Sequence, residues 1–208
     1  MNSKRSRIRR AAAVTAAAAT ALVLAACGTA DDGPAGHGGH TATSPSAPAA
    51  ASQGRHNAAD VAFAKGMIPH HRQAVRMAGL APGRAGSAEV RELAEDIRKA
   101  QGPEIGTLSG WLTSWGEEVP AEGAADHSAH GADGMMTAGQ MDALEDSSGA
   151  AFDTAFLEMM IEHHEGAVAM ARTERADGAY GPAKKMADAI IASQTAEIAR
   201  MNKLLGRD

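Results

Sequence analysis

Two segments of the chain combine methionine and histidine at a spacing that could bind a metal ion. In each segment a Met precedes a His-His pair by three residues, and together they contain Met67, His70, His71, Met160, His163 and His164. On a helix, residues three and four apart project from one face, so a thioether and an imidazole could reach a common ion. Such donors select Cu(I), or silver, over hard cations. The alternative is that these methionines are ordinary core residues.

The two segments belong to an internal repeat. A shift of 93 residues aligns residues 60–78 with residues 153–171, and 11 of the 19 positions are identical. Without a gap, the same shift aligns residues 93–108 with residues 186–201. A constant shift over two segments predicts a duplicated helix-loop-helix unit.

Apolar residues in both units recur at the spacing of amphipathic helices. We expect long helices near residues 57–79, 87–115, 149–175 and 182–205, and a short helix over residues 138–146. Ser87 is a candidate N-cap, and Thr137 with Gln140 resembles a capping box. The predicted fold class is therefore all-α, a four-helix bundle built from two helix-loop-helix repeats.

Two prolines distinguish the repeats. Pro69 and Pro103 fall inside predicted helices of the first repeat, whereas the second repeat has Glu162 and Ala196 at these positions. Proline removes a backbone donor and kinks a helix. We therefore expect the two halves to differ in geometry.

Polar residues interrupt the apolar stripe of the second helix in each unit, at Gln101, Glu104, Gln194 and Glu197. Buried polar groups need partners, so we expect these side chains to face the His pairs, either as metal ligands or as hydrogen-bond partners of the ligands. A metal-free network of His, Glu and Gln that fixes the register of the bundle would explain the same pattern.

The N-terminus has the three-part layout of a signal peptide. Five basic residues, an apolar run and Leu-Ala-Ala lead to Cys27, the only cysteine. The run is too short for a comfortable membrane span, and the sequence around Cys27 resembles a bacterial lipobox. We expect a signal peptide over residues 1–26, a lipidated Cys27 that begins a flexible tether over residues 27–56, and a domain over residues 57–208.

Within that domain the repeats cover about residues 57–115 and 149–206, and a His/Met-rich connector covers residues 116–148. The connector holds candidate metal-capture residues, His127, His130, Met135 and Met136. A protein with this layout would lie outside the cytoplasm, anchored by lipid on the outer face of the cytoplasmic membrane or in the periplasm.

Composition excludes several classes of function. A single cysteine cannot build a thiolate metal site. Five of the 20 basic residues, and none of the 25 acidic ones, precede Cys27, so the mature chain has a net charge of about −10 and nucleic acid is excluded as a partner. The sequence also has no nucleophile–base motif and no phosphate-binding loop.

The segments MIPHHRQAVRMA and MIEHHEGAVAMA, the stretch GMMTAGQMDAL and the paired QxxEI helices resemble the bacterial family called domain of unknown function 305. The resemblance spans about residues 57–205. It implies a ferritin-like four-helix bundle, an extracytoplasmic location and, for some members, copper binding through Met and His. It favours the six Met and His residues named above as ligands; Pro69 agrees with the family pattern and Glu162 departs from it.

Three functions remain open from the sequence. The first is an extracytoplasmic lipoprotein that sequesters copper or transfers it to a partner protein. The second is a di-iron or di-manganese redox protein, although such bundles use Glu and Glu-x-x-His ligands, and Glu158, Glu162 and Glu165 lie off the apolar stripe. The third is a metal-free structural or interaction module. An enzymatic role is less favoured than a binding role.

Overall fold

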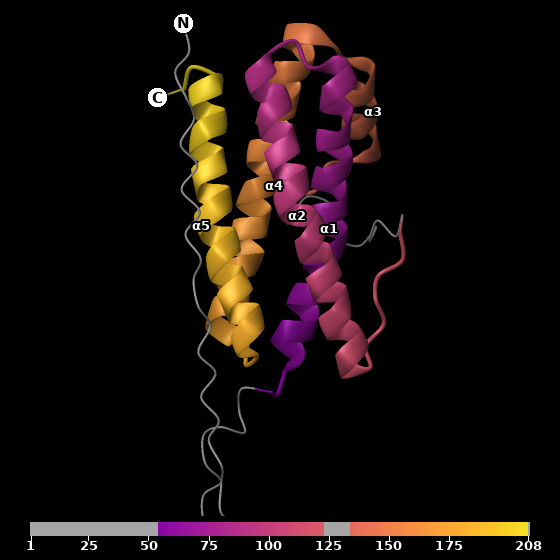
Figure 1. The fold of residues 1–208 in the computed structure, drawn as a ribbon, viewed down its shortest axis with the longest axis vertical. Coiled ribbons are helices and arrows are strands. Elements are labelled where there is room, and N and C mark those ends of the chain that lie inside the picture. The colour runs from indigo at the N-terminus through magenta and orange to yellow at the C-terminus, as the bar shows by residue number, and fades with distance from the viewer. Residues whose placement is uncertain (1–53, 123–133, 208) are drawn as a thin grey trace, which may run out of the picture. The chain divides into compact units, whose positions relative to one another are not determined.

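The computed structural model describes residues 54–122 and 134–207, which all lie in one compact unit of the chain, residues 46–208. Within these residues the fold is all-α (Figure 1), with helices α1 (Ala58–Arg84), α2 (Ala88–Trp115), α3 (Ala138–Asp146), α4 (Gly149–Asp177) and α5 (Gly181–Leu204). The prediction of a ferritin-like bundle is confirmed. No helix in the described part of the chain is long and apolar enough to cross a membrane.

Each repeat forms a helical hairpin, α1 with α2 and α4 with α5, and the hairpins meet through α1 and α4. These two helices run antiparallel. Ala85, after the end of α1, forms an isolated bridge with Gly149 at the start of α4. At the other end, Asn57 Nδ2 donates a 2.8 Å hydrogen bond to the carbonyl oxygen of Asp177. The short helix α3 lies beside α1 and α4 (Figure 1).

Two equivalent aspartates, one in each repeat, accept hydrogen bonds from the turn that joins the two helices of the other repeat. Asp153, near the start of α4, accepts hydrogen bonds from the amides of Gly86 and Ser87 at 2.9 and 2.8 Å. Asp60, its counterpart in α1, accepts from Tyr180 at 2.9 Å and from Ala179 at 3.2 Å. The shared DxAF sequence of the repeats thus stabilises the turns that join the helices.

The predicted helix starts are confirmed where the caps can be seen. Ser87 accepts a hydrogen bond from the amide of Val90 at 3.3 Å, and Thr137 with Gln140 forms a capping box. The predicted end of the first helix is wrong, because α1 continues from residue 79 to Arg84. Ala81 extends the buried stripe of α1, and this packing outweighs the local effects of Gly79 and Pro82.

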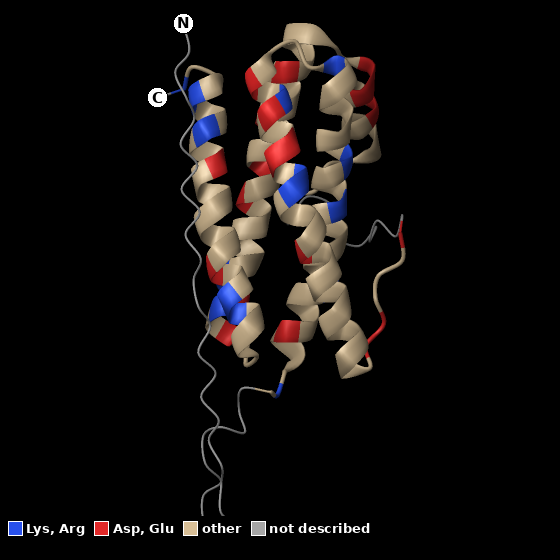
Figure 2. Cartoon of the chain, viewed as in Figure 1, with Lys and Arg blue, Asp and Glu red and all other residues tan. Residues whose placement is uncertain are grey.

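The buried apolar residues form two separate clusters. One contains Met67, Phe63, Leu108 and Ile190, and the other contains Met77, Met160, Phe156 and Met201. Basic and acidic residues are interspersed along the helices (Figure 2). The polar residues predicted from the sequence lie between the two apolar clusters along α1 and α4.

Candidate metal centre

The four predicted histidines are all buried in the bundle. His70 and His71 of α1 are 1% and 0% exposed, and His163 and His164 of α4 are both 0% exposed. The rings of His70 and His163 are in contact, with centroids 3.7 Å apart and planes inclined by 40°. The antiparallel packing of α1 and α4 thus brings the His pairs of both repeats into one polar layer, which we call the His layer.

His71 and His164, which we call the outer histidines of the His layer, are each paired with a glutamate from the second helix of their own repeat. His71 Nε2 lies 2.7 Å from Glu104 Oε2, and His164 Nε2 lies 2.6 Å from Glu197 Oε2. The glutamate side chains are 24% and 20% exposed, so they lie at the boundary between the His layer and solvent. The prediction that Glu faces His is met in both repeats.

The two predicted methionines flank the His layer from opposite sides. Met67 precedes His70 by one turn and belongs to one apolar cluster, and Met160 precedes His163 by one turn and belongs to the other. Both side chains are completely buried. Because α1 and α4 are antiparallel, the two thioethers lie on either side of the contacting imidazoles.

Several polar atoms of the buried His and Gln side chains have no hydrogen-bond partner within residues 54–122 and 134–207. They are both ring nitrogens of His163, Nδ1 of His71 and His164, both amide atoms of Gln101, and Oε1 of Gln194. Burial, with the neighbouring His70, His164 and His71, holds the pKa of His163 well below its usual range. His163 is therefore neutral at pH 7 and has a lone pair available for a metal ion.

The sequence of residues 60–205 matches the model of a family described as "Domain of unknown function (DUF305)". The match covers more than half of the chain. The chain belongs to the DUF305 family. Among curated proteins, no significant match to the chain is found.

Several solved structures are similar to this chain over most of their own length. A protein from Streptomyces coelicolor is 35% identical, with 71% of this chain and 92% of the other covered and a TM-score of 0.64. A DUF305 fragment from Deinococcus radiodurans is 29% identical, with 73% and 98% covered and a TM-score of 0.65. CopM in its Cu(II)-bound form is 35% identical, with 70% and 94% covered and a TM-score of 0.62.

CopM has also been solved in other metal-bound forms, with Cu(I) and with Ag. The Cu(I)-bound structure is 32% identical to this DUF305 chain, with 70% of this chain and 94% of the other covered and a TM-score of 0.59.

The donor set of this DUF305 domain fits a soft ion better than a hard one. Among the described residues, no group of three or more His, Cys, Asp or Glu side chains is placed to hold a metal ion. Glu158, Glu162 and Glu165 are exposed and do not supply carboxylates to the His layer. The residues in and beside the His layer that could hold an ion combine Met thioethers with imidazoles, and such donors suit Cu(I) or silver.

The connector of the DUF305 domain contacts α1 beside the His layer through Gln73, a residue that the sequence did not single out. Gln73, one turn after His70, accepts a 2.7 Å hydrogen bond from the amide of Met136 and donates a 2.8 Å bond to the carbonyl oxygen of the same residue. Gly134 packs directly on the backbone of Glu162 and His163.

Met136 is buried, and Met135 is half-buried. Of the other connector candidates, His127 and His130 lie outside the described residues, as does Cys27. The only sequence signal for Gln73 is a polar residue that follows the His pair on α1.

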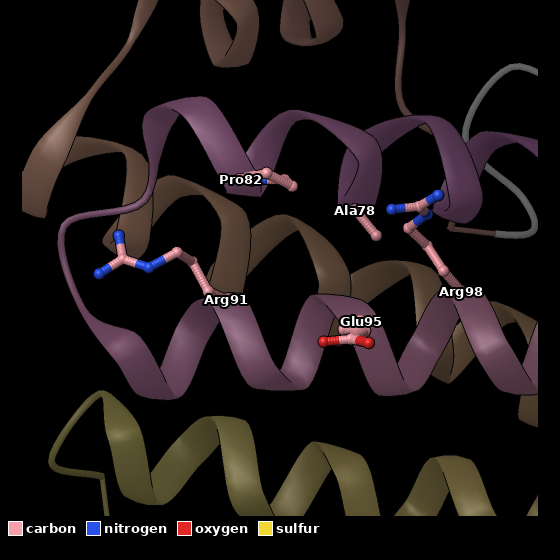
Figure 3. Close-up of a pocket in the computed structure, with 5 residues that line it drawn as sticks. All are labelled: Ala78, Pro82, Arg91, Glu95 and Arg98. Carbon is pink, nitrogen blue, oxygen red and sulfur yellow. The ribbon is translucent and has the colours of Figure 1, made fainter.

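A surface hollow of about 300 Å³ between α1 and α2 is a separate feature (Figure 3). Ala78, Pro82, Arg91, Glu95 and Arg98 line it. None of these side chains is a histidine or a methionine, and the two arginines would repel a cation. The hollow is therefore not part of the candidate metal centre.

Proposed function

We propose that this DUF305 protein binds copper as Cu(I) in the His layer, with silver as a close substitute, and that it sequesters the ion or transfers it to a partner protein. Met67, His70 and His71 would supply ligands from the first repeat, and Met160, His163 and His164 would supply them from the second. The protein acts in this proposal as a binder rather than as an enzyme.

The contact between His70 and His163 is the observation on which the proposal depends. A buried imidazole whose ring nitrogens have no hydrogen-bond partner costs free energy. Both ring nitrogens of His163 lack such partners within the described chain. A metal ion bound in this layer would use the lone pair that the fold leaves unused, and the flanking thioethers would favour a soft ion.

The relationship to CopM supports the same conclusion. CopM structures contain Cu(I), Cu(II) or Ag. The fold and the sequence similarity extend through the helices that carry the His and Met residues of this chain.

The proposed location follows from the N-terminal sequence. A lipid on Cys27 would hold the domain at the outer face of the cytoplasmic membrane through the tether of residues 27–56. In this position the connector residues His127, His130, Met135 and Met136 could take up copper before it reaches the His layer.

Competition titration with a Cu(I) chelator, combined with metal analysis, tests the proposal on the chain from residue 28 onward. The test variant replaces His70, His71, His163 and His164 with alanine. We expect submicromolar Cu(I) binding by the wild type and its loss in the variant. His56→Ala is the matched control, because His56 stacks on Trp115 at the end of the bundle with ring centroids 4.4 Å apart. Unchanged binding in the four-His variant would contradict the proposal.

A further inference from the structure

We propose that Glu104 and Glu197 determine which nitrogen of each outer histidine binds the ion: Nε2 donates to the glutamate, and Nδ1 is the metal ligand. This inference rests on the proposed function of the His layer. It assigns to the two glutamates the role of positioning residues, and it excludes them as metal ligands themselves.

The contacts at Nε2 support this assignment. A neutral imidazole has one nitrogen that donates a hydrogen and one that accepts, whereas an ionised carboxylate only accepts. His71 Nε2 lies 2.7 Å from Glu104 Oε2, so with an ionised carboxylate as acceptor the hydrogen of a neutral ring lies on Nε2. The same holds for His164 and Glu197 at 2.6 Å.

The surroundings of Nδ1 complete the argument. The Nδ1 atoms of His71 and His164 are inaccessible to solvent and have no hydrogen-bond partner in the part of the chain that the structure describes. With the hydrogen fixed on Nε2, each Nδ1 carries an unused lone pair inside the bundle. A lone pair in this position is costly to the metal-free fold and is available to an ion.

The arrangement occurs twice, with nearly the same geometry. The rings of His70 and His71 are 6.5 Å apart between centroids, and those of His163 and His164 are 6.4 Å apart. A hydrogen bond that the far nitrogen donates to a carboxylate fixes the ring orientation and raises the basicity of the ligating nitrogen. The negative charge of each glutamate also offsets part of the positive charge of a buried ion.

Nitrogen NMR of the full mature chain, labelled with ¹⁵N-histidine and free of metal, tests the tautomer directly. We expect the Nε2–H form for His71 and His164. In Glu104→Ala, His71 should shift to a mixture of tautomers, whereas His164 keeps its form and provides an internal control. Glu197→Ala should give the reverse result. Glu104→Gln keeps an acceptor oxygen, so it should restore the Nε2–H form of His71.

Silver then identifies the ligating atom, because the spin of bound silver couples to the nitrogen that it contacts. We expect the coupling on Nδ1 of His71 and His164, and we expect Glu104→Ala to weaken silver binding about 10- to 100-fold. Glu165→Ala, an exposed change on α4, should leave the silver affinity unchanged.

The outcomes separate this inference from the proposed function. Coupling at Nε2, or an Nδ1–H tautomer in the metal-free wild type, would overturn the inference and leave copper binding intact. Absence of silver coupling at every histidine would overturn the proposed function and the ligand assignment together. The tautomers of the metal-free protein would even then decide whether the glutamates position the rings.

Discussion

The rings of His70 on α1 and His163 on α4 contact each other with centroids 3.7 Å apart, although the two residues are 93 positions apart in the sequence. They are equivalent positions of the two repeats, so their contact marks the place where the hairpins meet at the middle of the core. Apolar clusters lie on both sides of this contact. The centre of the bundle is therefore occupied by imidazoles in place of apolar side chains.

Replacement of His163 by leucine should stabilise the metal-free protein. Leucine has a similar volume and removes two buried nitrogens that lack partners within the described residues. Removing an unsatisfied buried group is worth about 1 to 3 kcal/mol, so we expect the free energy of unfolding in urea to rise by about 1 kcal/mol.

The same variant should lose the stabilisation that the wild type gains from silver. For a ligand at 100 times its Kd this gain is about 2.7 kcal/mol.

The pKa of His163 is lowered in the folded state, so protonation of the unfolded chain lowers the stability of the wild type as pH falls below 6.5. The advantage of His163→Leu should accordingly grow under acidic conditions. A variant less stable than the wild type without metal would contradict this reasoning.

The methionines on either side of the His layer should matter for affinity more than for stability. Met67 and Met160 are fully buried, and leucine conserves their volume, so Met67→Leu and Met160→Leu should change the free energy of unfolding by less than about 1.5 kcal/mol. Loss of a thioether ligand should weaken Cu(I) binding about tenfold or more, the equivalent of about 1.4 kcal/mol.

Met201→Leu is the matched control, because Met201 is equally buried and belongs to the same apolar cluster as Met160 but lies on α5, which carries none of the four histidines. Competition titration of the three variants decides the question. Equal affinities for Cu(I) in all three would assign Met67 and Met160 to the core alone.

The helices and the inward orientation of the histidines could be predicted because they depend on periodicity. Residues spaced by three and four share a face in any helix. Because the repeat carries the same pattern twice, each inference from one segment is supported by the other. The pairings of His71 with Glu104 and of His164 with Glu197 follow from the same symmetry, since both members of each pair recur after 93 residues.

The difference between the halves that Pro69 and Pro103 predict does not extend to the two His–Glu pairs. The two His–Glu distances differ by only 0.1 Å, and both α1 and α2 remain continuous helices. Pro69 is half-buried and Pro103 is exposed, so each lost backbone hydrogen bond lies away from the packed face. The sequence shows where each proline lies, but tertiary packing determines whether its lost hydrogen bond faces the core or the solvent.

The contact of Gln73 with Met136 could not be predicted because it joins a helix to a connector with no periodicity. Such a contact is set by the loop, where spacing along the chain does not determine proximity. The acid pair Asp60 and Glu174 instead joins two helices, and it depends on the antiparallel register of α1 and α4, which the repeat alone does not give.

Substitution of Gly134 by alanine should detach the connector from the His layer. Gly134 has a φ of 71°, and a Cβ atom there would lie 2.3 Å from the carbonyl oxygen of Glu162. We expect Gly134→Ala to lower the free energy of unfolding by more than about 1 kcal/mol.

Gly79→Ala is the contrasting variant, because a Cβ at this exposed position inside α1 meets no atom within 4 Å. It should stabilise the helix by about 0.5 to 1 kcal/mol. Equal effects of the two substitutions in urea unfolding would show that the connector does not depend on this contact.

The buried acid pair of Asp60 and Glu174 should make stability depend on pH in the neutral range. Both side chains are at most 1% exposed. Burial, followed by the hydrogen bond and the negative charge of Asp60, raises the pKa of Glu174 from 4.5 to about 8, and Lys184 opposes this shift. The pKa of Asp60 is lowered, because its hydrogen bonds from Tyr180, Asn57 and Ala179, together with that from Glu174, outweigh its own burial.

The folded protein therefore retains the proton of Glu174 between about pH 4.5 and pH 8, whereas the unfolded chain releases it. Because the folded state binds more protons in this window, the free energy of unfolding falls as pH rises through it. One proton corresponds to about 1.4 kcal/mol per pH unit at most. Glu174→Gln keeps the shape of the side chain but cannot ionise, so its free energy of unfolding should depend less on pH than that of the wild type from pH 5 to pH 8. Glu165→Gln, on the exposed face of α4, should follow the wild type. Urea unfolding at several pH values measures both slopes, and the same slope in Glu174→Gln and wild type would show that Glu174 is already ionised in the folded protein.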